Sequence, residues 1–101
     1  MLKIEEIRNL CIDNAIILTD HLITRMRQRK IRFKDIKNTI KNGEIIKQYE
    51  TDYPFPSCLI NGENLHIVCS ISEFNLYIIT AYRPSLEQWE AGGKIKKESK
   101  P

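Results

Sequence analysis

The chain has 101 residues, of which 42% are hydrophobic and 29% are charged, and its formal net charge is +3. That length holds one domain, and this balance is ordinary for a globular protein, which excludes fibrous and low-complexity chains. No apolar run reaches the roughly 18 residues that a transmembrane helix needs, so we expect no membrane partner. The first six residues alternate charged and apolar side chains without the apolar segment of a signal peptide, which predicts a cytoplasmic protein.

Three segments in the first half of the chain have the 3.6-residue periodicity of amphipathic helices. We predict these helices at about residues 2–12, 20–30 and 33–42. Thr19 or Asp20 is suited to cap the start of the second helix, and Asn42-Gly43 is a natural end for the third. Between the first two helices, residues 13–18 are expected to form a loop that leads into a short strand.

The second half of the chain changes to the two-residue period of β-strands. We predict strands at residues 44–49, 57–60, 65–71 and 76–82. Asn61-Gly62 is a turn signal, and the two prolines of residues 51–56 exclude ladder pairing there, as Pro84 does after the last strand. The predicted fold class is α+β, with two to three N-terminal helices packed on one face of a roughly four-stranded antiparallel sheet.

The end of the chain differs in composition from the rest. Residues 85–90 have room for one helical turn that holds Trp89. From Gly92-Gly93 onward the sequence is short, polar and rich in lysine, which is typical of disorder. We therefore expect a single domain over residues 1–91 and a basic, disordered tail over residues 92–101.

Positive charge is concentrated between Arg25 and Lys41. This stretch has eight basic residues and one acidic residue, so it carries +7 while the other 84 residues sum to −4. Such clustering is expected of a protein that binds a polyanion such as RNA, although a solvated helix face has the same appearance. The candidate RNA-binding side chains are Arg29, Arg32, Lys34, Lys37 and Arg83.

His21, Arg25 and Arg29 are spaced by four residues and therefore share one helix face. The helix dipole and Arg25 both disfavour a charged His21, which suits a general base near neutral pH. Two guanidinium groups beside it are suited to clamp a phosphodiester. The alternatives are a histidine that merely packs at a helix start, and arginines that pair with a carboxylate across the fold.

Tyr82 and Arg83 close the last predicted strand, where they are placed to stack on a base or donate to a phosphate. His66 is expected to face the same cleft as Tyr82 from the adjacent strand, which makes it a second candidate acid or base. The alternative is a tyrosine at the edge of the core with an arginine that extends into solvent.

The three cysteines, Cys11, Cys58 and Cys69, form no C-x-x-C pair and are interpreted as reduced core residues. The spacing supports neither a zinc site with the two histidines nor a thiol nucleophile paired with His66. We therefore expect no metal and no cofactor.

Taken together, these residues resemble a family of small bacterial proteins known mainly as a domain of unknown function. Its members are commonly encoded beside a zinc-finger/helix-turn-helix antitoxin of the MqsA type. The resemblance runs from about Thr19 to Trp89. Its matching pieces are His21-x-x-x-Arg25-x-x-x-Arg29-x-Ile31, Asp35-Ile36, Asn42-Gly43-Glu44-Ile45-Ile46, Tyr49, Asp52-Tyr53-Pro54, Pro56-Ser57-Cys58-Leu59, Leu65-His66-Ile67-Val68 and Ile79-Thr80-Ala81-Tyr82-x-Pro84.

The chain departs from the family at the joint between the second and third helices. The family usually has Gly-Ile-Ser/Thr where this chain has Lys30-Ile31-Arg32. The change removes a glycine suited to left-handed backbone and an N-cap hydroxyl, at a cost on the order of 1 kcal/mol. It also adds two positive charges beside Arg29.

The family looks like a member of the barnase/EndoU/colicin/RelE superfold, which includes the RelE and MqsR toxins. The resemblance implies a RelE-like layout and a metal-independent endoribonuclease that acts as a type II toxin by 2′-OH attack. Its partners would be RNA, including ribosome-bound mRNA, and a cognate zinc-finger/helix-turn-helix antitoxin. Carried over, His21 would be the base or acid, Arg25 and Arg29 would stabilise phosphate, Tyr82 and Arg83 would assist, and His66 would be the reserve. A non-catalytic RNA- or protein-binding module on the same fold is the alternative.

Overall fold

A computed structural model of the chain describes residues 1–85, residue 89 and residues 93–94. The elements are, in chain order, α1 (Ile4–Asn9), β1 (Ile16–Leu18), α2 (Asp20–Arg29), α3 (Phe33–Asn42), β2 (Glu44–Tyr49), β3 (Ser57–Gly62), β4 (Leu65–Ser72) and β5 (Asn75–Tyr82). The predicted α+β class is confirmed. The expected helical turn over 85–90, the tail over 92–101 and the domain limit between them lie mostly outside the described residues.

The sheet has five strands in the order β1-β5-β4-β3-β2. Strands β2 to β5 are antiparallel neighbours, whereas β1 runs parallel to β5 and pairs Ile16 with Leu76. The prediction of a roughly four-stranded antiparallel sheet is therefore corrected to a mixed sheet of five strands. The short strand expected after residue 13 is this added edge strand, and its three residues depend on β5 for their pairing.

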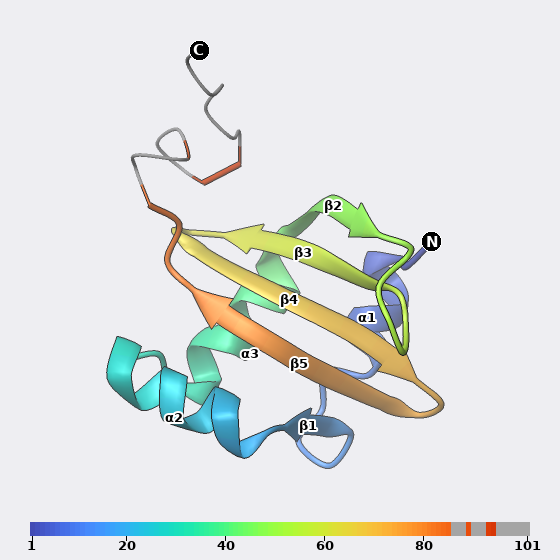
Figure 1. Cartoon of the computed structure of the whole chain (residues 1–101), viewed down its shortest axis with the longest axis horizontal. Helices are drawn as coiled ribbons and strands as arrows, with labels where there is room; N and C mark the ends of the chain where they lie inside the picture. Colours follow the sequence, from blue (N-terminus) through green and yellow to red (C-terminus); the bar gives the residue numbers. More distant parts are fainter. Residues whose placement is uncertain (86–88, 90–92, 95–101) are drawn as a thin grey trace.

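The helices cover one face of the sheet. Figure 1 shows α1 and α3 behind the sheet, with α2 beside β5. Ile7 of α1, Leu22 of α2 and Ile36 of α3 are at most 1% exposed and belong to one apolar cluster with Ile60 and Ile67 of the sheet. Burial of each such side chain contributes about 1.5–3 kcal/mol. This apolar layer therefore determines which side chains of each strand face the helices. None of the helices in the described residues is long and apolar enough to cross a bilayer.

Two predicted boundaries are wrong for identifiable reasons. Helix α1 begins two residues later than predicted because the backbone N–H and carbonyl of Leu2 both bond to the Gln48 side chain, at 3.2 and 2.8 Å. It also ends at Asn9, three residues before the predicted end. The chain turns between β3 and β4 at Glu63-Asn64, where φ is 24° and 65°, and Asn61-Gly62 instead belongs to β3. Gly62 serves close packing there, because a Cβ would lie 3.1 Å from a side-chain carbon of Thr39.

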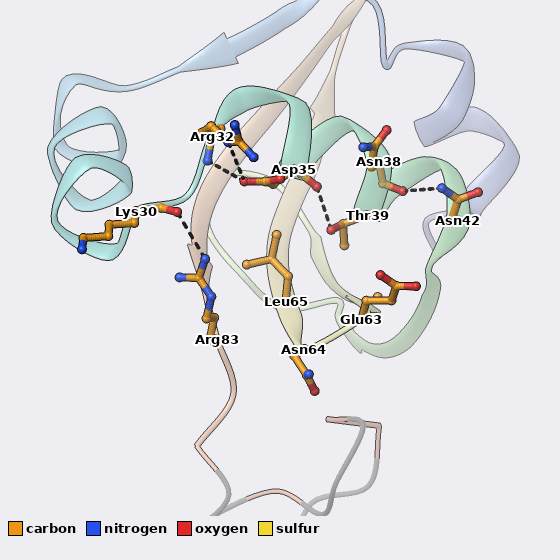
Figure 2. Close-up of a pocket in the computed structure, with 11 residues that line it drawn as sticks. Lys30, Arg32, Asp35, Asn38, Thr39, Asn42, Glu63, Asn64, Leu65 and Arg83 are labelled. Carbon is orange, nitrogen blue, oxygen red and sulfur yellow. Dashed lines mark hydrogen bonds and ion pairs between the residues drawn. The ribbon is translucent and has the colours of Figure 1, made fainter.

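Lys30-Ile31-Arg32 joins α2 to α3, and both helices have identifiable end contacts. The side chain of Thr19 caps α2 by accepting from the Leu22 N–H at 3.1 Å. At the other end of α2, Lys30 takes the left-handed conformation with φ 55°, which a glycine adopts at less cost. At the start of α3, the Asp35 carboxylate accepts from the Arg32 N–H at 2.9 Å (Figure 2), which is the acidic half of a capping box.

Candidate functional site

The sheet face turned away from the helices carries the polar side chains of the candidate site. Strand register places Asn61 of β3, His66 of β4 and Tyr82 of β5 directly opposite one another. Their chain neighbours Ile60, Ile67 and Ala81 point to the helices. We call the side of the sheet bearing Asn61, His66 and Tyr82 the open face, because Figure 1 shows all three described helices away from it.

His66 is the most deeply enclosed of the predicted site residues, with 0% of its surface exposed. Its Nε2 lies 2.6 Å from the carbonyl oxygen of Gly93, which only accepts, so Nε2 carries the proton and donates. Nδ1 is then an acceptor and lies 3.3 Å from the Tyr82 hydroxyl, which donates to it. The two neighbours thus fix both the tautomer and the orientation of the imidazole.

Burial sets the protonation of this pair. The pKa of His66 is lowered because burial penalises the imidazolium, although the Gly93 carbonyl works in the opposite direction. The pKa of Tyr82 is raised, chiefly because burial penalises the phenolate. At neutral pH the site therefore holds a neutral imidazole, which can take a proton, beside a protonated phenol, which can give one.

The lowered pKa of His66 predicts a pH-dependent stability. Below its ordinary pKa of about 6.5 the unfolded chain binds more protons at this residue than the folded chain does. The His66 contribution is therefore complete above that pH and is lost as the pH falls toward the folded value. We expect the free energy of unfolding in urea to fall between pH 7.5 and 5.5, and His66→Gln to flatten this slope. An imidazole titration by NMR with a midpoint at or above the ordinary value would contradict the prediction.

Residues near the C-terminal end of the chain cover His66. The Trp89 ring meets the imidazole edge to face, with centroids 4.5 Å apart. Gly93 has φ 72°, and a Cβ there would lie 2.8 Å from both the Asn61 Oδ1 and a ring carbon of Pro84. The next residue, Lys94, forms an ion pair with Glu44 of β2 at 2.8 Å. Sequence reasoning missed this cover because Gly92-Gly93 is also typical of a tail.

Two arginines fasten helix α2 to the end of β5. The Arg29 guanidinium donates to the Ala81 carbonyl at 2.9 Å. Arg83 donates in return to the carbonyls of Arg29 and Lys30, the latter at 3.2 Å. These contacts satisfy backbone acceptors at the C-terminus of α2. Ala81 and Arg83 are the chain neighbours of Tyr82, so both guanidinium groups lie close to this residue in the chain, and each has further N–H donors.

His21 and Arg25 lie elsewhere. Both side chains are exposed on α2, and the Arg25 guanidinium donates to Gln28 of the same helix at 3.2 Å. His21 precedes Arg29 by eight residues, which is about 12 Å along the helix axis. Helix α2 packs on the core side of the sheet, opposite the open face. The structure therefore brings His66 and Tyr82 together but does not bring His21 or Arg25 to them.

The other predicted RNA-binding residues differ in their freedom to bind. Lys34 is exposed on α3, and Arg32 is exposed with Asp35 at 3.8 Å. Lys37 is engaged already, because its ammonium group lies 3.0 Å from Asp13 and 4.7 Å from the centre of the Phe33 ring.

The cysteines lie on the core side of the structure. The sulfur atoms of Cys58 and Cys69 are 4.0 Å apart in adjacent strands, and Cys11 is buried separately. Cys58 is on the opposite sheet face from His66, so the two do not form a thiol–imidazole pair. In the part of the chain that the structure describes, no three His, Cys, Asp or Glu side chains gather into a group that could hold a metal ion.

Comparison with known proteins identifies the family. Residues 18–83 match the family described as domain of unknown function DUF4258. This segment is more than half of the chain and includes α2, α3, strands β2 to β5 and every predicted site residue. The chain therefore belongs to this family. No curated protein and no solved structure shows significant similarity to it.

Proposed function

We propose that this member of the DUF4258 family is a metal-independent endoribonuclease with a RelE-like fold, the toxin of a type II toxin–antitoxin pair. The observation that carries the proposal is the pair formed by His66 and Tyr82, with 3.3 Å between Nδ1 and the hydroxyl. The pair lies at one end of the open face of the sheet. The exposed cationic side chains of α2 and α3 supply the electrostatic attraction for RNA.

The proposed reaction moves one proton through this pair. The 2′-oxygen of the substrate attacks the adjacent phosphorus while the bond to the 5′-oxygen breaks, which yields a 2′,3′-cyclic phosphate and a 5′-hydroxyl. The proton of the 2′-OH passes to the pair of Tyr82 and His66 and returns to the departing 5′-oxygen. Tyr82 is only half-buried and meets the RNA, whereas buried His66 acts through it. Arg29, whose guanidinium lies at the carbonyl of Ala81 next to Tyr82, is assigned to stabilise the charge on phosphorus.

The experiment that tests the proposal maps new RNA 5′ ends across the transcriptome after brief induction in a bacterial host. Because ribosome-bound mRNA is a possible substrate, the mapping is done in cells. We expect new ends with 5′-hydroxyls in the wild type. The double variant His21→Ala/Arg25→Ala, at matched protein level, should keep the cleavage positions, because those residues lie away from the open face. Loss of all ends in the double variant would move the reacting centre to α2.

Burial of His66 favours a second candidate function. The Gly93 carbonyl occupies Nε2, and no part of the imidazole surface is exposed. A histidine held in this way also suits a purely structural role in a non-catalytic RNA- or protein-binding module. This alternative predicts that RNA crosslinks to the protein in cells. It also predicts that neither the wild type nor any variant produces new 5′ ends.

The proposed partner is a small protein with C-x-x-C pairs and a helix-turn-helix, encoded beside this chain. A toxin of this kind needs an antitoxin to be tolerated by its host. The discriminating observation is the neighbouring gene, whose co-expression should suppress both growth arrest and the new RNA ends.

A further inference from the structure

Two cysteines face each other across adjacent strands, neither of which is at the edge of the sheet. Cys58 of β3 and Cys69 of β4 are register partners, and their sulfur atoms lie 4.0 Å apart. Both side chains are 0% exposed and belong to the apolar cluster on the helix side. They are therefore separate from His66 and Tyr82 on the open face, and the proposed function does not use them.

The backbone at this pair meets the geometric requirement of a disulfide. Directly opposed residues of an antiparallel pair have Cα atoms about 4.5 or 5.5 Å apart, and disulfides join Cα atoms about 4.4–6.8 Å apart. The sulfur atoms of Cys58 and Cys69 would approach from 4.0 Å to a bond length of about 2.0 Å. Rotation of the two side chains about their Cα–Cβ bonds is sufficient for this approach, so the strands keep their register.

The contact between the thiols gives them different roles. The hydrogen bond with Cys69 lowers the pKa of Cys58, against the effect of burial. The same bond, together with burial, raises the pKa of Cys69. The thiolate, and not the thiol, is the form that attacks an oxidant, so Cys58 is oxidised first. Cys69 is already in contact with it and is placed to attack the oxidised sulfur.

Burial of both sulfur atoms selects a small oxidant. Figure 1 shows α1 behind the end of the sheet where β3 begins and β4 ends. This helix has six residues, of which only Ile7 is buried. Elements with few buried contacts open locally more often than the rest of a fold. Hydrogen peroxide is little larger than water and can enter during such openings, whereas a glutathione disulfide is too large.

We propose that Cys58 and Cys69 form an intramolecular disulfide when the folded protein meets hydrogen peroxide. The Cys58 thiolate attacks one peroxide oxygen, the O–O bond breaks and hydroxide leaves, which makes Cys58 a sulfenic acid. The Cys69 sulfur then attacks the Cys58 sulfur, the S–O bond breaks and the S–S bond forms. The protons of the two thiols pass to the departing oxygens. The pair loses two electrons, and the peroxide is reduced to two molecules of water.

The disulfide fastens β3 to β4 and should make the protein harder to unfold. It joins residues 11 positions apart in the chain, and closing a loop of this length should lower the unfolding equilibrium constant about 100-fold. The bond lies three register pairs from Asn61 and His66 and on the opposite sheet face. The inference is therefore independent of the proposed function.

The test treats the reduced, folded full chain with hydrogen peroxide, blocks the remaining thiols under denaturing conditions and cleaves the chain after glutamate. Cleavage after Glu63 separates the peptide 51–63, which holds Cys58, from the peptide 64–73, which holds Cys69. We expect mass spectrometry to find these peptides joined, with a combined mass lower by two hydrogens. Dithiothreitol should separate them again. The oxidised chain should also unfold at a higher urea concentration than the reduced chain.

Cys11 supplies the controls, because it is buried but follows α1 and lies outside the sheet. Cys11→Ala should form the disulfide like the wild type, whereas Cys58→Ala should not. In the urea-unfolded chain the sheet register is lost, so peroxide should join Cys11 to either of the other two cysteines as well. Unjoined peptides from the folded wild type, or the same mixture of pairings as in urea, would overturn the proposal. Because the wild type is mapped directly, this result does not depend on whether either variant folds.

Discussion

Tyr82→Phe is expected to abolish RNA cleavage, with a loss of about 10²–10⁴-fold, while the protein remains folded. The substitution removes only the oxygen that lies 3.3 Å from Nδ1 of His66. The proton of the 2′-OH then has no path to the buried imidazole. The aromatic contact with His66, at 5.3 Å between centroids, is retained, so the loss of one hydrogen bond should cost only about 0.5–1.5 kcal/mol of stability.

The matched control is Tyr77→Phe in the same strand. Tyr77 is half-buried, pairs with Ser70 and lies five residues before Tyr82 in the chain. Its hydroxyl is therefore outside the proposed proton path, and the control should cleave like the wild type. The measurement counts 5′-hydroxyl ends per transcript at matched protein levels. Full cleavage by Tyr82→Phe would exclude the proton path through His66 and leave the nuclease to be explained by another site.

Much of the fold follows from local patterns in the sequence. The boundaries of α3 are predicted correctly because Ile36 and Ile40 repeat with helical spacing and Gly43 follows the last turn. The strands after it are also predicted, because β-favouring apolar residues are bounded by proline, glycine and asparagine at the turns. By contrast, β1 has three residues and is defined by its pairing with β5. No local pattern encodes a partner that lies some 60 positions further along the chain.

The same distinction separates the two halves of the predicted site. His66 and Tyr82 belong to adjacent antiparallel strands, so alternation and register bring them together as expected. His21 requires a different kind of information, namely which face of the sheet α2 covers. That choice depends on how Leu22 and Met26 pack in the core. Spacing along one helix cannot reveal it.

The cover over His66 shows a third limit of sequence patterns. Gly93 contacts His66 and leaves no room for a Cβ, a requirement that arises only from the tertiary packing around it. In composition the segment resembles a linker. The role of Gly93 and Lys94 becomes recognisable only when this segment is placed beside β2, where Lys94 pairs with Glu44.

Gly43→Ala is expected to lower the free energy of unfolding by about 3 kcal/mol, at the upper end of what overpacking costs. Gly43 follows α3 with φ −86°, a conformation that alanine adopts without strain, so the effect is purely steric. A Cβ would lie 2.5 Å from the Thr39 carbonyl oxygen and 2.6 Å from that of Asn61. Both obstacles are backbone atoms, one in α3 and one in β3, so neither can move without shifting its element.

Gly62→Ala supplies the comparison, because its Cβ would meet a side-chain carbon of Thr39 at 3.1 Å. A methyl group can give way by a few tenths of an ångström, so we expect a loss of only about 1 kcal/mol. Urea unfolding monitored by circular dichroism measures both differences. Equal values for the two variants would contradict the view that backbone contact between α3 and β3 sets the cost. Since Asn61 also neighbours His66 in the register, a shift of β3 in Gly43→Ala should also perturb the imidazole signals of His66, which links this joint to the candidate site.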